Sequence, residues 1–257
     1  PIEYIEELNK EFIENFIIHW KIDRKWAPKT IKNHMCSLSL FLKWCVNEKI
    51  IDENPILWIP KPRIPKRSMK WLPQDQASNL IEYARNMPTQ YQFYKARWVA
   101  IISTFIYTGI RFSELRMLKM SDIDLKNRTL FVQQWKGAKD RIIPMPISLI
   151  SSLEKYLEHR MRLNRKCIYF FTSSQSDTGM CYNSLRTYIT KLKQYSWISF
   201  YAHKLRRTFA TLMLEWGCDL YALSKMMWHS DISTTEKYLS ASVNHLHKQV
   251  NKHPLNF

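Results

Sequence analysis

Residues 203–238 constrain the fold of this chain more than any other stretch. Apolar side chains recur at helical spacing up to Trp216 and again from Leu220 to Met227, and Gly217 separates the two runs. Apolar residues three and four apart lie on one face of a helix, so the pattern predicts two amphipathic helices joined by a tight break.

The same stretch carries a set of polar side chains suited to phosphate chemistry. His203 and Arg206 are three residues apart and share a helical face, and His229 and Tyr238 follow at the end of the second run. Imidazole and guanidinium groups donate hydrogen bonds to phosphate oxygens. An ordinary tyrosine has a pKa of about 10, so only about 0.1% is phenolate at pH 7 and cations are needed to activate it. The grouping predicts attack by Tyr238 on a phosphodiester.

The segments HKLRRTFAT and HSDISTTEKY resemble the second signature region of the tyrosine recombinase (phage integrase) family, in the style of its Xer-like members. The family pattern is His-X-X-Arg, then His or Trp, then Tyr nine residues beyond. His203, Arg206, His229 and Tyr238 match all of it. The family often has Gly before the second His, where this chain has Trp228.

Residues 108–115, TGIRFSEL, are similar to the first signature region of that family. Gly109 breaks a predicted helix, and Arg111 stands just past the break, where its side chain can point into a cleft. A lone arginine at such a place is usually structural. The resemblance implies that Arg111 is the first catalytic arginine.

A predicted β-hairpin supplies the remaining catalytic candidate. Two strands, 129–134 and 141–144, flank a turn that contains Gly137. A lysine at a hairpin tip is more often a solvated turn residue. The resemblance implies that Lys136, directly before Gly137 in a KGxK pattern, reaches the scissile phosphate, with Lys139 as the alternative.

The resemblance also implies the reaction. Tyr238 attacks the scissile phosphorus, which leaves a 3′-phosphotyrosyl bond and a free 5′-hydroxyl. The two arginines bind the non-bridging oxygens, and Lys136 protonates the leaving 5′-oxygen. His203 assists proton transfer on the tyrosine side, and His229 donates a hydrogen bond to a phosphate oxygen.

Positive charge is concentrated in the second part of the chain. Residues 1–65 hold ten Lys and Arg against nine Asp and Glu, whereas residues 66–257 hold 29 against 13, within a total net charge of +17. This distribution favours a polyanionic partner, and we expect double-stranded DNA. The predicted DNA-binding residues are Lys61, Arg63, Lys66, Arg67, Lys139, Arg141 and Arg207.

Four parts of the chain are expected. Residues 1–60 form a helical domain that resembles a core-binding, DNA-binding domain through PKTIKNHMCSLSLFLKW, although any small helical bundle could show this pattern. Residues 61–72 are a basic, proline-rich linker, which could equally be solvated without a DNA contact. Residues 73–240 are the catalytic domain, and residues 241–257 are a C-terminal tail.

The expected fold class is mainly α with a small β-hairpin or sheet (α+β), and the resemblance implies a helical N-terminal core-binding domain and a tyrosine recombinase catalytic domain. Helical periodicity predicts helices over 3–20, 28–47, 74–86, 90–107, 147–160 and 183–194, with another starting near Ser113. A short strand is expected over 168–171. The proline-rich stretch 54–73 is expected to be non-helical.

The tail carries a narrow apolar stripe of Val243, Leu246 and Val250. About eleven residues are marginal as a free helix, so this stripe must pack on something. It could pack on its own domain. The resemblance implies docking into a neighbouring subunit, and a homotetramer on two DNA sites.

Several function classes receive no support from the sequence. The five cysteines are scattered singly, and neither His203 nor His229 has the spacing of a metal ligand set, so no metal is expected. The resemblance implies a reaction that needs no cofactor, and the absence of a GxxxxGK[ST] loop agrees with a reaction that needs no ATP. No apolar run of about 18 residues and no signal-peptide pattern occur, so we expect no membrane and a cytoplasmic location.

Three alternatives remain at this point. A purely structural helical protein would have no reason to hold all six catalytic candidates together. A type IB topoisomerase uses closely similar chemistry to relax DNA without a partner strand. A catalytically silent DNA-binding protein would share the fold. The sequence identifies neither the DNA site, nor accessory proteins, nor whether the reaction is integration, excision or dimer resolution.

Overall fold

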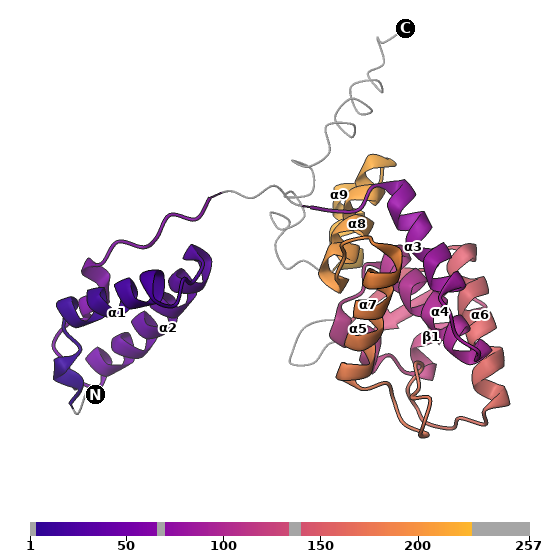
Figure 1. The fold of residues 1–257 in the computed structure, drawn as a ribbon, viewed down its shortest axis with the longest axis horizontal. Helices are drawn as coiled ribbons and strands as arrows, with labels where there is room; N and C mark the ends of the chain where they lie inside the picture. Colours follow the sequence, from indigo (N-terminus) through magenta and orange to yellow (C-terminus); the bar gives the residue numbers. More distant parts are fainter. Residues whose placement is uncertain (1–3, 66–69, 134–139, 228–257) are drawn as a thin grey trace, which may run out of the picture. The chain divides into compact units, whose positions relative to one another are not determined.

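The computed structural model describes residues 4–65, 70–133 and 140–227, and the chain divides into two compact units, Pro1–Arg67 and Ser68–Phe257. Figure 1 shows the described elements of each unit.

The first unit is built on two helices. After a 3-10 turn, η1 (Ile5–Glu7), come α1 (Lys10–Ile22) and α2 (Pro28–Asn47). The α1 helix begins where the Asn9 side chain accepts a hydrogen bond from the Phe12 amide at 2.9 Å. This cap sets the start of α1 at Lys10, whereas periodicity alone predicts a helix from residue 3, so the predicted start was wrong.

A second difference lies in the proline-rich stretch. Residues Pro55–Trp58 form a 3-10 helix, η2, although non-helical structure is predicted there. Proline fits the first turn of a helix because the N–H it lacks has no partner at that position. The Asn54 side chain accepts from the Ile56 amide and donates to the Ser39 carbonyl at 3.0 Å, which ties η2 to α2.

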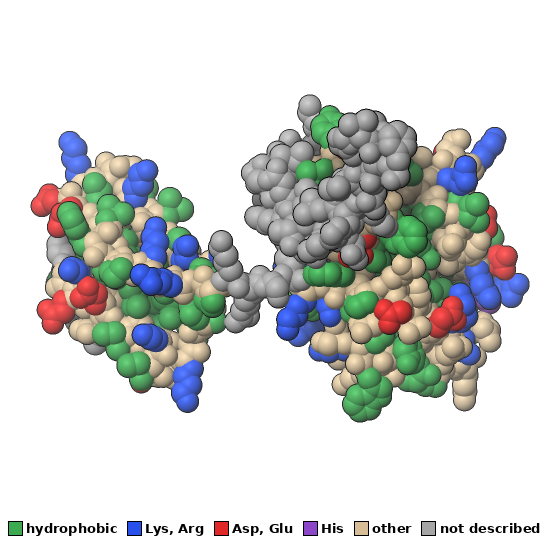
Figure 2. Space-filling view, turned by 90° about the horizontal axis from the view of Figure 1, so that it is seen from above, with side chains coloured by type: hydrophobic (Ala, Val, Ile, Leu, Met, Phe, Trp, Pro, Cys, Tyr) green, Lys and Arg blue, Asp and Glu red, His purple; other side chains and the backbone are tan. Residues whose placement is uncertain are grey.

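The core of the first unit is small. Its fully buried side chains include Ile13, Met35 and Leu42, while Leu40, Phe41 and Trp44 on α2 stay exposed. Figure 2 shows hydrophobic side chains interspersed with Lys and Arg over the visible face of this unit. A unit of this size buries a limited share of its apolar surface, which agrees with these exposed side chains.

The second unit is organised around α4 (Gln92–Thr108), which is buried on nearly all sides. A helix that is apolar around its whole circumference belongs in the centre of a domain. It packs against α3 (Gln74–Asn86), α6 (Ile147–Arg162) and α8 (Ala202–Glu215), and α7 (Tyr182–Ser196) packs on α3. Two short helices, α5 (Phe112–Met117) and α9 (Leu220–Met227), complete the helical part.

A three-stranded antiparallel sheet lies between α5 and α6 in the chain, with the order β1-β2-β3. A 3-10 turn, η3 (Met120–Asp122), leads into β1 (Ile123–Asp124), β2 (Thr129–Val132) and β3 (Arg141–Pro144). Leu130 pairs with Ile143, and both are fully buried. Alternation along each strand therefore directs one face of the sheet into the core.

Two details of the sheet differ from the prediction. The two-residue β1 was not predicted, because it is too short to show periodicity. Residues 168–171 form no named strand; Tyr169 instead makes an isolated bridge with Lys119. The predicted hairpin turn at Gly137 lies outside the described residues.

Within the described ranges, none of the helices combines the length and apolar character that a membrane crossing needs.

Candidate active site

The turn after α4 positions Arg111. Gly109 ends α4 in the left-handed region with φ 60°, and its amide donates to the Phe105 carbonyl at 3.1 Å. A Cβ at this position would lie 2.5 Å from Cδ1 of Phe209 on α8. Only glycine satisfies both the backbone angle and this close approach. The glycine therefore lets α8 pack directly on the turn that precedes Arg111.

Arg206 connects three parts of the second unit. Its guanidinium is buried on α8, where Nη1 donates to the Gly109 carbonyl at 2.8 Å and Nη2 donates to the Met227 carbonyl at the end of α9. A planar guanidinium held at two of its nitrogens has a fixed orientation. Met227 precedes His229 by two residues, so this bond anchors the chain just before the predicted second histidine.

His203 lies one helical turn before Arg206. Its pKa is lowered from the ordinary value by partial burial of the ring, and next by the positive charges of Arg207, Arg206 and Arg111. The influence of Arg111 on this ring means that side chains from α8 and from the start of α5 share one region. A lowered pKa keeps the imidazole neutral at pH 7, so it can accept a proton.

A buried carboxylate holds Arg111 in place. Arg111 Nη1 donates to Glu114 Oε1 at 2.7 Å, and the Arg111 amide donates to Glu114 Oε2 at 2.8 Å. The same carboxylate accepts two bonds from Arg141, at 3.0 Å from Nη1 and 2.6 Å from Nη2. Glu114 is therefore shared by two guanidinium groups, one from α5 and one from β3.

This network also includes one predicted DNA-binding residue. The Arg141 side chain is 2% exposed and pairs with Glu114, so the structure gives it a partner inside the domain. Its role is to support the carboxylate that holds Arg111.

Glu114 is a site residue that was missed at the sequence level. It stands three residues after the cap residue Arg111, the spacing of a capping-box glutamate, and that signal could have identified it. Burial raises the pKa of its carboxyl, but the hydrogen bonds and charge of Arg141, with the hydrogen bonds from Arg111, lower it to about 2.

We expect Glu114→Gln to lower the free energy of unfolding by about 2 to 3 kcal/mol at pH 7, because it leaves two guanidinium groups without their carboxylate. The carboxyl pKa falls from 4.5 to about 2 on folding. The stabilisation is therefore fully present above pH 4.5 and is lost as pH falls from 4.5 toward 2. Denaturant unfolding at a series of pH values measures both effects.

The matched control is Glu158→Gln, which removes an exposed carboxylate from α6. It should leave the unfolding midpoint and its acid dependence unchanged. A Glu114→Gln protein with the wild-type pH profile would contradict the assigned network.

The structure describes only some of the remaining predicted residues. Arg207 is half-buried on α8, and Lys61 and Arg63 are exposed in the first unit. Outside the described residues lie Lys66, Arg67, Lys136, Lys139, His229 and Tyr238. Of the six predicted catalytic residues, the structure brings together Arg111, at the N-cap of α5, with His203 and Arg206 on α8.

A polar stripe follows one face of α7. Its residues line a shallow hollow of about 400 Å³ and are Asn183, Arg186, Thr187, Thr190, Lys191 and Gln194. They are spaced three and four apart, so they share one face of the helix, and they include no carboxylate. Side chains with amide and guanidinium groups are the ones that hydrogen-bond to base edges in DNA.

Among the described residues, no group of three or more His, Cys, Asp or Glu could hold a metal ion.

Comparison with protein families gives two matches that together span most of the chain. The model of the Phage integrase family matches residues 70–245, and that of the Phage integrase SAM-like domain matches residues 3–61.

Individual relatives agree with these matches. The chain is 30% identical over 268 residues to Tyrosine recombinase XerD of Rickettsia bellii (strain RML369-C). The alignment covers 98% of this chain and 86% of the relative. It is 31% identical over 232 residues to Tyrosine recombinase XerC of Bacillus licheniformis, and that alignment covers 88% of this chain and 74% of the relative.

Solved structures share the fold. The crystal structure of XerA recombinase matches with a TM-score of 0.62 at 27% identity, covering 98% of this chain and 86% of that one. The post-cleavage complex of XerH site-specific recombinase with palindromic difH substrate matches with a TM-score of 0.78 at 18% identity, covering 98% and 74%.

Proposed function

We infer that this chain, which belongs to the phage integrase family, acts as a tyrosine-type site-specific recombinase on double-stranded DNA. It cleaves and rejoins DNA strands through a covalent 3′-phosphotyrosyl intermediate. The observation that carries this inference is the cluster of Arg111, His203 and Arg206, held by Glu114 and by the Gly109 turn. Incubation with labelled site DNA should trap the protein as a covalent adduct on a denaturing gel.

Tyr238 is the proposed nucleophile. Its oxygen attacks the scissile phosphorus in line, the bond from phosphorus to the 5′-oxygen breaks, and a 5′-hydroxyl leaves. The 5′-hydroxyl of a partner strand then attacks the phosphotyrosyl bond and releases the tyrosine. Because the phosphodiester energy is kept in the covalent link, neither step requires ATP.

The two arginines supply the charge stabilisation that phosphoryl transfer needs. The Gly109 and Met227 carbonyls orient Arg206, and Glu114 orients Arg111, so both guanidinium groups are positioned before DNA binds. His203, neutral at pH 7, accepts the tyrosine proton, and His229 donates a hydrogen bond to a phosphate oxygen.

Lys136 is the proposed general acid for the 5′-oxygen, with Lys139 as the alternative. We expect Lys136→Ala to slow cleavage at least about 100-fold, the usual contribution of general acid catalysis, with little loss of binding. A substrate with a 5′-bridging phosphorothioate should restore the rate, since sulfur leaves without a proton. If this substrate does not rescue Lys136→Ala but does rescue Lys139→Ala, then Lys139 is the general acid.

Proposed DNA contacts are drawn from both units. They comprise Lys61, Arg63, Lys66, Arg67, Lys139 and Arg207, together with the polar stripe on α7. Residues 1–60 are proposed as the core-binding domain, 61–72 as the linker and 73–240 as the catalytic domain. The SAM-like match to residues 3–61 supports the first of these, and the Phage integrase match to residues 70–245 supports the last. With DNA as the proposed substrate, the cytoplasm is the proposed location.

A homotetramer on two DNA sites is proposed, with residues 241–257 docking into a neighbouring subunit. An apolar cavity of about 680 Å³ supports this, because it offers an acceptor for the stripe of Val243, Leu246 and Val250. The cavity lies among α3, α4, α8 and α9, and its lining includes Ile81, Ile106, Leu212, Met213, Trp216 and Met226.

We expect a chain that ends after Ser240 to bind one site as a folded monomer but to form no four-subunit synapse, because the docking stripe is gone. Native gels with one and two DNA sites measure this. Trp216→Ala, which truncates an exposed side chain of the cavity in the full-length chain, should weaken the synapse in the same way. Normal strand exchange by the shortened chain would exclude tail docking.

A further inference from the structure

A second polar cavity, of about 430 Å³, lies among α3, α4 and α6. Two helices contribute to it at the same spacing of three, four and seven residues, so each contributes one face. The α4 residues are Gln92, Lys95, Ala96 and Val99, and the α6 residues are Ser148, Ser151, Ser152 and Lys155. Arg85, near the end of α3, completes the lining.

The charge of this cavity has one sign. Three of its lining side chains, Arg85, Lys95 and Lys155, are cationic, and no carboxylate lines it. Arg85 donates to Glu82 at 2.6 Å, and both side chains are more than half exposed. In the part of the chain that the structure describes, neither Lys95 nor Lys155 has an ion pair. Like charges grouped without a counter-ion favour the binding of an anion.

The neutral residues favour a compact anion. The three serines lie on one face of α6, where Ser152 donates its hydroxyl hydrogen to the Ser148 carbonyl at 3.0 Å and the exposed Ser148 and Ser151 supply two further hydroxyls. Hydroxyls donate hydrogen bonds to phosphate oxygens. Ala96 and Val99 are buried and form an apolar floor. The volume falls within the usual range for small-molecule sites and exceeds what a phosphate ion alone would fill.

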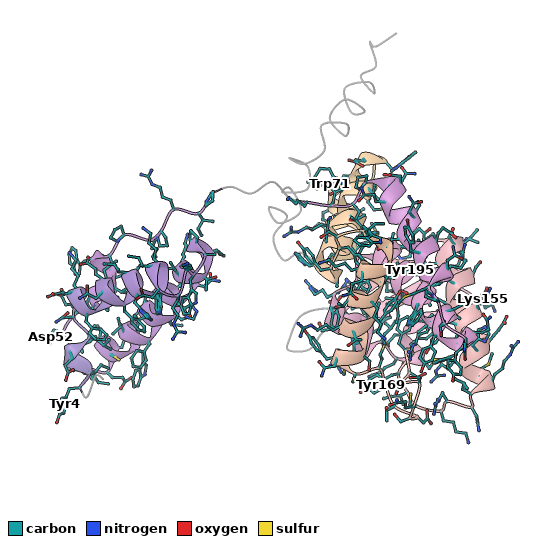
Figure 3. All side chains as sticks on the ribbon, viewed as in Figure 1. Tyr4, Asp52, Trp71, Lys155, Tyr169 and Tyr195 are labelled. Atoms are coloured by element: carbon teal, nitrogen blue, oxygen red, sulfur yellow. The ribbon has the colours of Figure 1, made fainter. Side chains whose placement is uncertain are left out.

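This cavity is separate from the candidate active site. Lys95 lies near the start of α4, whereas Thr108, at its end, precedes the Gly109 turn and Arg111. At 1.5 Å per residue, the 13 residues from Lys95 to Thr108 span about 20 Å. Figure 3 shows Lys155 at the edge of the unit formed by α6, across from α5 and α8.

We propose that this cavity binds a small phosphate ester of about mononucleotide size. Lys95 and Lys155 neutralise the phosphate, the hydroxyls of Ser148 and Ser151 on α6 donate hydrogen bonds to its oxygens, and the Ala96 and Val99 floor receives the organic part. An extended acidic peptide fits less well, because the cationic residues surround a hollow and do not form a track along the surface.

Lysine acetylation of the full chain, measured residue by residue by mass spectrometry, tests the site. Adenosine 5′-monophosphate should slow the modification of Lys95 and Lys155 several-fold, while the exposed Lys126 and Lys166 react as before. Adenosine, which lacks the phosphate, should protect neither cavity lysine. Absence of protection, or equal protection by adenosine, would overturn the proposal.

A double variant, Lys95→Gln with Lys155→Gln, should weaken binding of adenosine 5′-monophosphate about tenfold or more in a calorimetric titration, because two charge-assisted contacts are lost. Lys126→Gln with Lys166→Gln removes the same charge elsewhere and should bind normally. Wild-type affinity in the folded cavity variant would refute the site. A 20-base-pair duplex that protects Lys95 and Lys155 when the mononucleotide does not would show a DNA contact and overturn the small-ester assignment.

Discussion

Tyr238→Phe is expected to eliminate the covalent protein–DNA adduct while leaving DNA affinity within about twofold of wild type. The substitution removes one hydroxyl oxygen, and that atom is the one that would bond to phosphorus. Removing a nucleophile costs about 10⁴-fold or more in well-studied covalent enzymes, so the adduct should fall below detection. Denaturing gels of protein incubated with labelled site DNA give the adduct, and a mobility shift on a native gel gives the affinity.

Two other tyrosines provide matched controls. Tyr201 occupies the N-cap position of α8, two residues before His203, and is exposed, so it is the strongest rival nucleophile. Tyr195 donates its hydroxyl hydrogen to the Asn86 carbonyl at 3.1 Å and packs against Tyr83, which holds it against α3 (Figure 3). Tyr201→Phe and Tyr195→Phe should keep normal adduct levels. An adduct that survives Tyr238→Phe and disappears in Tyr201→Phe would reassign the nucleophile.

Local patterns in the sequence predicted most helices of the second unit. The predicted ranges 74–86 and 183–194 correspond closely to α3 and α7, because their apolar spacing is regular and Pro73 stands at the N-cap of α3. The failures have separate causes. A single cap at Asn9 delays α1, a proline at the first position permits η2, and Tyr169 pairs with Lys119 through an isolated bridge that leaves no pattern in the sequence.

The candidate site was less predictable, because it depends on contacts between distant residues. His203 and Arg206 share one helix face, so their spacing alone places them together. Arg111 joins them because Gly109, which has no Cβ, leaves room for the Phe209 ring of α8 to pack against its backbone. This contact joins residues 100 positions apart in the sequence. Arg141 resembles any surface arginine in sequence, and its burial follows from pairing with Glu114 across 27 residues. Burial of a charge depends on its tertiary partner, which helical or strand periodicity does not reveal.

Arg206→Lys is expected to slow cleavage at least about 1,000-fold while the protein remains folded. Lysine keeps the positive charge but presents a single nitrogen, so it cannot span the Gly109 and Met227 carbonyls and also stabilise phosphate oxygens. Losing one preorganised donor to the transition state costs about 100- to 1,000-fold, and here the orientation of the group is lost as well. Single-turnover cleavage rates at saturating protein measure this effect without a contribution from binding.

Stability measurements on the same variants separate catalysis from folding. Arg206→Ala should also lower the free energy of unfolding by about 2 to 4 kcal/mol, because it leaves two buried carbonyls without donors and opens a cavity between α8 and α9. Arg162→Lys, at the exposed end of α6 and outside the proposed catalytic and DNA-binding residues, keeps its charge and should retain both activity and stability. If Arg206→Lys cleaves within about tenfold of wild type, the guanidinium serves only to join α9 to the Gly109 turn, and the charge stabilisation must come from Arg111.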